Sequence, residues 1–149
     1  TGGSSILVMS SIPQTYTDLV LAVNGDSDVD DEFRLRFNGD AGSNYRVLFL
    51  YASSGGVSSA QYAATDYAQL GGLFTAGTAT GSNMINIFSY SNTTINKTVV
   101  NTTNSGNYTQ FRTNTWKSTA AITRIDAYVA GGTFTNPTTF SLYGIKAAV

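Results

Sequence analysis

Short runs in which apolar and polar residues strictly alternate constrain this sequence more than any other feature. The clearest is Phe33 to Phe37, where Phe33, Leu35 and Phe37 alternate with two arginines. A period of two places one set of side chains on one face of a β-strand and the other set on the opposite face. The same pattern recurs over Thr15–Asn24, Tyr45–Tyr51, Met84–Tyr90 and Ile122–Val129. We therefore expect half-buried strands in these runs. The exception is Tyr45–Tyr51, where Leu48 and Leu50 make the second face apolar as well, so we expect a central strand there.

Turn residues, rich in Asn, Gly and Asp, separate the alternating runs. A chain of about eight to ten short strands at close spacing is typical of a sandwich or a barrel. The sequence therefore predicts an all-β fold, an antiparallel β-sandwich of the jelly-roll type. We expect a single domain over residues 1–149, with a short flexible N-terminal arm of about residues 1–5.

Three segments are harder to interpret. Ser59 is a possible cap for a helix that runs through Leu70 and ends at Gly71. We favour a long loop with one short edge strand over residues 57–70, because Ser and Thr are frequent there and a 3.6-residue period is missing. The run Ile6–Met9 predicts a strand buried on both faces, with a buried helical turn as the alternative that periodicity leaves open. The closing run, Thr139–Ala147, is apolar on both faces and predicts a strand in a sheet centre.

The composition argues against catalysis and against nucleic acid as a partner. The chain has no cysteine and no histidine, which removes thiolate chemistry, cysteine-ligated metals and the commonest general base. Charged residues make up 11% of the chain and the formal net charge is -1, so we expect no basic face for nucleic acid. No apolar run approaches the ~20 residues of a membrane span, and we expect no membrane partner.

The carboxylates are the remaining candidates for site chemistry. Alternating aspartates at Asp26, Asp28 and Asp30 are weak candidate ligands for a hard cation such as calcium. The glycine and the bidentate glutamate of an EF-hand loop are missing, so we expect a solvated turn and no cofactor. Four further aspartates are scattered along the chain, and we do not expect any two to form a catalytic pair; they are Asp18, Asp40, Asp66 and Asp126.

Tyrosine is frequent, with 9 residues, and suits contact surfaces because its ring is apolar and its hydroxyl is polar. Tyr62, Tyr67 and Tyr108 lie in loop-like sequence and are our candidates for exposed contact residues. The polar arm adds the interface candidates Thr1, Gly2 and Gly3, and we expect the arm and then the segment 57–70 to reach a partner.

Several short pieces occur in a fixed order and cover most of the chain. They are Ile12–Leu19, Phe37–Asp40 with Ser43–Tyr45, Tyr90–Thr93 with Asn96–Thr98, Ala121–Ile125, Gly132–Phe134 and Leu142–Ile145. With these pieces the sequence resembles jelly-roll virion proteins of tailed phages, and is most similar to capsid decoration (cement) proteins. The resemblance implies a non-enzymatic structural protein on the outer capsid surface of the virion. It also implies a homotrimer, with the major capsid protein as its partner.

Related jelly rolls occur in head fibres and tail fibres of phages. An alternative is therefore a receptor- or carbohydrate-binding module of such a fibre. A shallow groove lined by tyrosines and Trp116 would favour that alternative, because aromatic rings stack on sugars.

Overall fold

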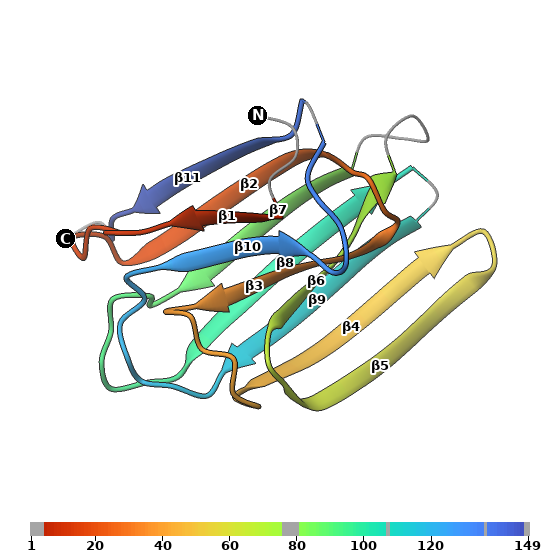
Figure 1. Ribbon diagram of the computed structural model, residues 1–149. Coiled ribbons are helices and arrows are strands. Elements are labelled where there is room, and N and C mark those ends of the chain that lie inside the picture. Colours follow the sequence, from red (N-terminus) through yellow and green to blue (C-terminus); the bar gives the residue numbers. More distant parts are fainter. Residues whose placement is uncertain (1–4, 76–80, 107, 136, 148–149) are drawn as a thin grey trace.

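The computed structural model describes residues 5–75, 81–106, 108–135 and 137–147. Within these ranges the chain forms eleven strands, arranged as two antiparallel sheets that face each other (Figure 1). This arrangement confirms the expected antiparallel β-sandwich, with slightly more strands than the sequence predicts.

The smaller sheet has four strands and lies towards the viewer in Figure 1. Its order is β1 (Ile6–Met9), β10 (Ile125–Val129), β3 (Asp31–Phe37) and β6 (Ala68–Thr75). Every neighbouring pair in this sheet is antiparallel.

The larger sheet has seven strands and lies behind the smaller one. Its order is β11 (Thr139–Ile145), β2 (Asp18–Ser27), β7 (Gly81–Phe88), β8 (Lys97–Ser105), β9 (Tyr108–Trp116), β4 (Tyr45–Ser53) and β5 (Gly56–Thr65). A short parallel contact between the ends of β2 and β6, at Ser27 and Thr75, joins the two sheets at one corner.

The apolar core lies between β2 and β7 of the larger sheet and β3 and β10 of the smaller one. The apolar sets of the alternating runs face inward, as the sequence predicts; they include Leu19, Leu21, Val23, Phe33, Leu35, Phe37, Ile85, Ile87, Ile125 and Ala127. Alternation has this effect because every second side chain of a strand points to the same face. The rings of Phe37 and Trp116 extend the core to β9, with centroids 5.6 Å apart.

Beneath β6 the interior is polar. Asn114 on β9 accepts a hydrogen bond of 2.9 Å from the backbone N–H of Gln69 and donates one of 3.0 Å to its carbonyl. Asn101 on β8 donates through Nδ2 to the carbonyl of Leu70 over 2.7 Å. Along its length β6 pairs only with β3, and at its end it touches β2. The buried side-chain amides of Asn101 and Asn114 therefore hold β6 from across the sandwich.

The expected long loop over residues 57–70 is wrong, and so is the helix considered beside it, whereas the edge strand expected in this segment is present as β5 and is longer than expected. Two strands, β5 and β6, occupy this segment, and a turn at Asp66 and Tyr67 joins them. The sequence gives no two-residue period for β5 because both of its faces are exposed. Because neither face of β5 is buried, neither face requires apolar residues, and the composition of β5 resembles that of a loop.

The two terminal segments form strands as predicted, but their burial and their places in the sheets were predicted wrongly. β1 lies at the edge of the four-stranded sheet, and Ile6 on its outer face is 50% exposed. β11 lies at the edge of the seven-stranded sheet and pairs only with β2. Phe140 and Leu142 still pack against the core from this edge, whereas Tyr143 is exposed. Apolar residues on both faces therefore did not mean burial on both faces.

Candidate functional site

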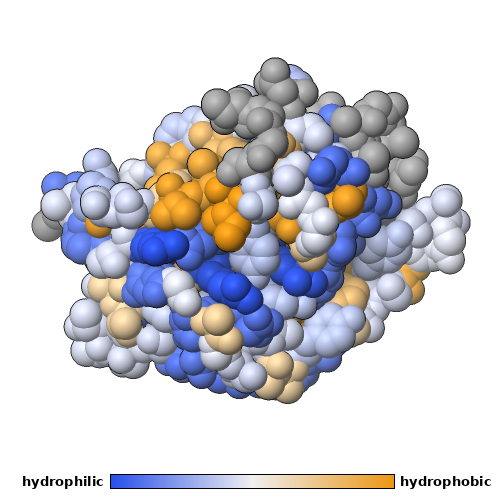
Figure 2. Space-filling view, in the orientation of Figure 1, coloured by the Kyte–Doolittle hydropathy of each residue, from blue (hydrophilic) through white to orange (hydrophobic). Residues whose placement is uncertain are grey.

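The two outer faces of the sandwich differ sharply in charge. On the four-stranded side, Glu32, Arg34 and Arg36 project from β3. Arg34 Nη2 lies 3.3 Å from Glu32 Oε2, and Arg36 pairs with Asp66. Figure 2 looks onto this side and shows hydrophilic side chains across its centre, with a hydrophobic patch over β1. Asp126 of β10, which lies opposite Arg36 in the pairing of β10 with β3, adds a further charge to this face.

The outer face of the seven-stranded sheet is uncharged through its middle, where apolar side chains lie among Thr, Ser and Asn. One row of paired residues crosses six strands and consists of Ala22, Met84, Thr102, Phe111, Leu50 and Ser59. Phe111 in this row is 44% exposed. In the part of this face that the structure describes, charged side chains lie only near the ends of the strands. Asp18 and Arg46 lie at one of these ends. We call this surface the outer face below.

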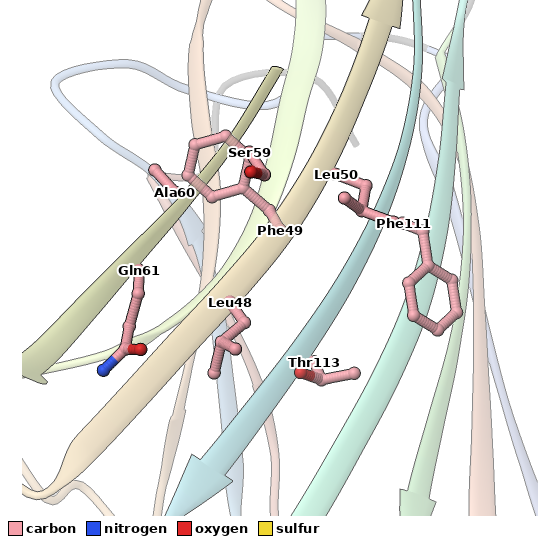
Figure 3. A pocket seen from close by; sticks show the side chains of 8 residues that line it. All are labelled: Leu48, Phe49, Leu50, Ser59, Ala60, Gln61, Phe111 and Thr113. Carbon is pink, nitrogen blue, oxygen red and sulfur yellow. The ribbon is translucent and has the colours of Figure 1, made fainter. Parts of the chain in front are cut away.

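A shallow groove of about 470 Å³ lies in the outer face where β9, β4 and β5 run side by side. Figure 3 shows Leu48 and Leu50 of β4, with Phe111 and Thr113 of β9, along this groove. Ser59 and Gln61 of β5 form its other wall. Every one of these side chains is uncharged, so the groove suits an uncharged, partly apolar occupant.

β5 itself is a free edge. Among the described strands it pairs only with β4, and Figure 1 shows this hairpin reaching beyond the four-stranded sheet. The ten residues of β5 include no charged residue and no proline. Free edges normally carry such residues because unpaired backbone groups otherwise recruit another strand.

The structure places two of the three candidate tyrosines, Tyr62 and Tyr108, beside one buried arginine, Arg112, on the inner side of the sheet. Arg112 of β9 stacks on Phe49, with Cζ 4.8 Å from the ring centroid, and its Nη1 lies 4.0 Å from Glu32 Oε1. Tyr62 packs beside Phe49 with centroids 5.9 Å apart. Burial lowers the pKa of Arg112, while Glu32, Tyr108 and Tyr62 act in the opposite direction.

Tyr108 belongs to this cluster, whereas Tyr67 lies apart from it. The ring of Tyr108 lies 5.2 Å from that of Tyr51, and burial raises the pKa of Tyr108. Tyr67 lies under Arg34, whose Cζ is 3.9 Å from the ring centroid. We call Phe49, Tyr51, Tyr62, Tyr108 and Arg112 the inner ledge. Tyr62 is its most exposed tyrosine, at 46%, whereas Tyr67 and Tyr108 are half-buried.

Sequence reasoning missed Arg112, Glu32 and Phe49. One signal was available, because Arg112 shares its alternation phase with Asn114 and Trp116. Side chains at these alternate positions point inward, so the charge of Arg112 requires buried partners. The other interface candidates, Thr1, Gly2 and Gly3, lie outside the described residues.

Trp116 does not line a groove. It is only 3% exposed and stacks on Tyr45, with centroids 6.4 Å apart and an interplanar angle of 20°. Trp116 therefore cannot line the groove of tyrosines and Trp116 that was considered from the sequence. The reason is that Trp116, like every second residue before it in β9, points its side chain towards the core.

The alternating aspartates do not converge. Asp28 accepts hydrogen bonds from both the backbone N–H and the hydroxyl of Thr133, at 2.6 and 2.8 Å. These two bonds lower the pKa of Asp28. The backbone N–H of Asp26 donates a hydrogen bond of 3.1 Å to the hydroxyl of Thr138. Within the ranges that the structure covers, Asp, Glu, His and Cys side chains nowhere gather in groups of three or more that could hold a metal ion.

The four scattered aspartates each have a separate partner. Asp18 accepts from the backbone N–H of Ser89 and Asp40 from the indole of Trp116, whereas Asp66 and Asp126 pair with arginines. Their contacts lie in different parts of the sandwich, so each carboxylate has a structural role of its own.

No helix in the described part of the chain has the length and hydropathy to cross a bilayer. No protein-family model matches the sequence, and neither does any curated protein or any solved structure.

Proposed function

We propose that this chain is a structural, non-enzymatic virion protein that binds the outer surface of an assembled phage capsid and stabilises it. The contrast between the two outer faces of the sandwich carries this proposal. The charged four-stranded side suits contact with water, and the uncharged outer face of the seven-stranded sheet suits contact with protein. The partner is the major capsid protein, in line with the sequence resemblance to decoration proteins.

Such binding stabilises a capsid by mass action. A protein that binds the assembled shell and not its free subunits shifts the equilibrium towards the shell. Apolar area removed from water contributes about 25 cal/mol per Å², so the exposed Leu48, Leu50, Met84 and Phe111 provide a driving force. We propose a homotrimer, as the resemblance implies, because several linked contacts bind far more tightly than one.

Heads that lack this protein test the proposal. They should release DNA at a lower temperature, or at a lower magnesium concentration, than complete heads. Purified protein added back should restore them. Depleted heads that are equally robust, in particles that fail to attach to cells, would contradict the capsid role and favour the alternative below.

The alternative is a carbohydrate-binding module of a head or tail fibre, and the inner ledge favours it. Tyr62 and Phe49 offer a partly exposed aromatic surface beside the buried Arg112. Sugar rings stack on aromatic faces and accept hydrogen bonds from guanidinium groups. Binding to a glycan array that a Tyr62→Ala substitution abolishes would support this alternative.

A further inference from the structure

We propose that β5 pairs with β5 of a second copy of this chain, antiparallel and about a twofold axis, so that two seven-stranded sheets become one continuous sheet. This contact adds a defined surface between copies to the proposed function and does not require the capsid as a partner. Because it has twofold symmetry, it relates two copies, and in a homotrimer it would join subunits of two trimers.

The first support is the state of the edge. β5 spans Gly56–Thr65 and is exposed on both faces, with β4 as its only described neighbour. A strand of this length, about 33 Å at ~3.3 Å per residue, presents a row of backbone groups without strand partners. The Nζ of Lys117 donates to the carbonyl of Ala63 over 3.0 Å, and the register with β4 shifts between Tyr62 and Thr65. The free and regular part of the edge is therefore Val57 to Tyr62.

The second support is charge. The edge has no charged side chain, so an acidic or basic strand beside it would lose solvation without gaining an ion pair. The occupant must be an uncharged extended segment, and β5 of a second copy has this property. Val57 is 79% exposed and would lose much of this exposure beside a neighbouring strand.

The third support is register. Antiparallel partners directly opposite each other point to the same face. A register centred on Ala60, one of the two central residues of the free part, sets Ala60 opposite Ala60, Ser59 opposite Gln61 and Ser58 opposite Tyr62. Ser59 and Gln61 both line the groove, so the grooves of the two copies would lie next to each other. No bulky pair and no pair of like charges meets across the axis.

A single cysteine tests the pairing, because the natural chain has none. In an Ala60→Cys variant the two sulfurs would lie opposite each other, and Cα atoms across an antiparallel pair fall within disulfide range. Under mild oxidation at micromolar concentration we expect a covalent dimer. The matched control is Ser54→Cys, at the tip of the same hairpin, whose two copies would lie about 40 Å apart at ~3.3 Å per residue.

The expected result is cross-linking of the Ala60→Cys variant at least about tenfold faster than that of the Ser54→Cys variant, owing to its higher effective concentration. Equal rates for both variants, or no cross-link at residue 60, would overturn the pairing. A second measurement is sedimentation of an Ala60→Lys variant, which sets two like charges across the axis and should shift the protein to smaller species. Unchanged sedimentation of this variant would also overturn the proposal.

The outcome is separable from that of the capsid proposal. Protein that fails to cross-link and still restores depleted heads would contradict only the edge pairing. Protein that cross-links and does not restore heads would contradict only the capsid role.

Discussion

The indole Nε1 of Trp116 donates a hydrogen bond of 2.7 Å to Oδ2 of Asp40. This bond ties the end of β9, in the seven-stranded sheet, to the loop that leaves β3 of the four-stranded sheet. The same carboxylate accepts from the backbone N–H of Gly42 over 2.9 Å and from the side-chain amide of Asn44. A tryptophan considered for sugar stacking and an aspartate considered for catalysis thus close one end of the sandwich together.

We predict that Asp40→Asn destabilises the protein by about 1–3 kcal/mol at neutral pH, because an amide nitrogen would face the donors that Asp40 now satisfies. Unfolding in urea, followed by tryptophan fluorescence, measures this loss. An Asp30→Asn variant is the control, since Asp30 is exposed and should change stability little. Equal stability of the two variants would contradict the role assigned to Asp40.

The pH dependence of this difference follows from the pKa of Asp40. Burial acts to raise that pKa, but the hydrogen bonds from Trp116, Gly42 and Asn44 outweigh it and hold the pKa below its ordinary value. The ionised carboxylate therefore stabilises the fold above the unfolded-state pKa of about 3.9. This contribution is lost as the pH falls through the lower pKa of the folded state. The gap between wild type and Asp40→Asn should accordingly narrow below about pH 4.

Gly71→Ala is predicted to destabilise the protein by about 2–4 kcal/mol, because it combines backbone strain with overpacking. Gly71 has a φ of +96°, and a Cβ there would lie 2.8 Å from Gln110 Oε1 and 2.9 Å from Thr103 Oγ1. Gly39→Ala is the control, with a φ of +71° and nothing within 4 Å of its Cβ. It should cost only about 1–2 kcal/mol. Thermal unfolding compares the two, and a smaller loss at Gly71 would contradict the close approach of β6 to β8 and β9.

We expect the fold to be independent of metal. Asp28 uses its carboxylate to hold Thr133, in the loop that follows β10. The midpoint of thermal unfolding should therefore be the same with and without a chelator. A drop of roughly ten degrees or more on chelation would mean that a bound ion stabilises the native state.

The sequence predicts a strand well where one of its faces is buried. In β2, β3 and β7 the core demands an apolar residue at every second position, and the period is visible. The period is missing at β5, where neither face is buried. For β1 and β11 the sequence predicts the strands themselves but not their positions at the sheet edges. Strand order depends on contacts between distant segments, and alternation carries no information about which strand lies beside which.

The same limit applies to the candidate surfaces. The sequence identifies Tyr62, Tyr67 and Tyr108 as contact candidates, but the position of Tyr62 and Tyr108 beside Arg112 depends on the pairing of β4 with β5 and β9. The middle row of the outer face takes one residue from each of six separate strands. Its lack of charge becomes visible only when Met84, Phe111 and Leu50 stand in one row.

The capsid role predicts that Phe111→Lys abolishes the stabilisation of depleted heads while the protein remains folded. Phe111 stands in the middle of the outer face and is 44% exposed, so a lysine there disturbs no core packing. An interface that covers this position would have to desolvate an unpaired ammonium group, which costs several kcal/mol. Ile6→Lys is the matched control, because Ile6 is 50% exposed on the four-stranded side. We expect the Ile6→Lys protein to restore depleted heads as wild type does, and the Phe111→Lys protein to leave them fragile, with circular dichroism showing the same fold for both. If Ile6→Lys is the variant that fails, the sandwich binds the capsid through its four-stranded side, and the orientation proposed from the charge contrast is reversed.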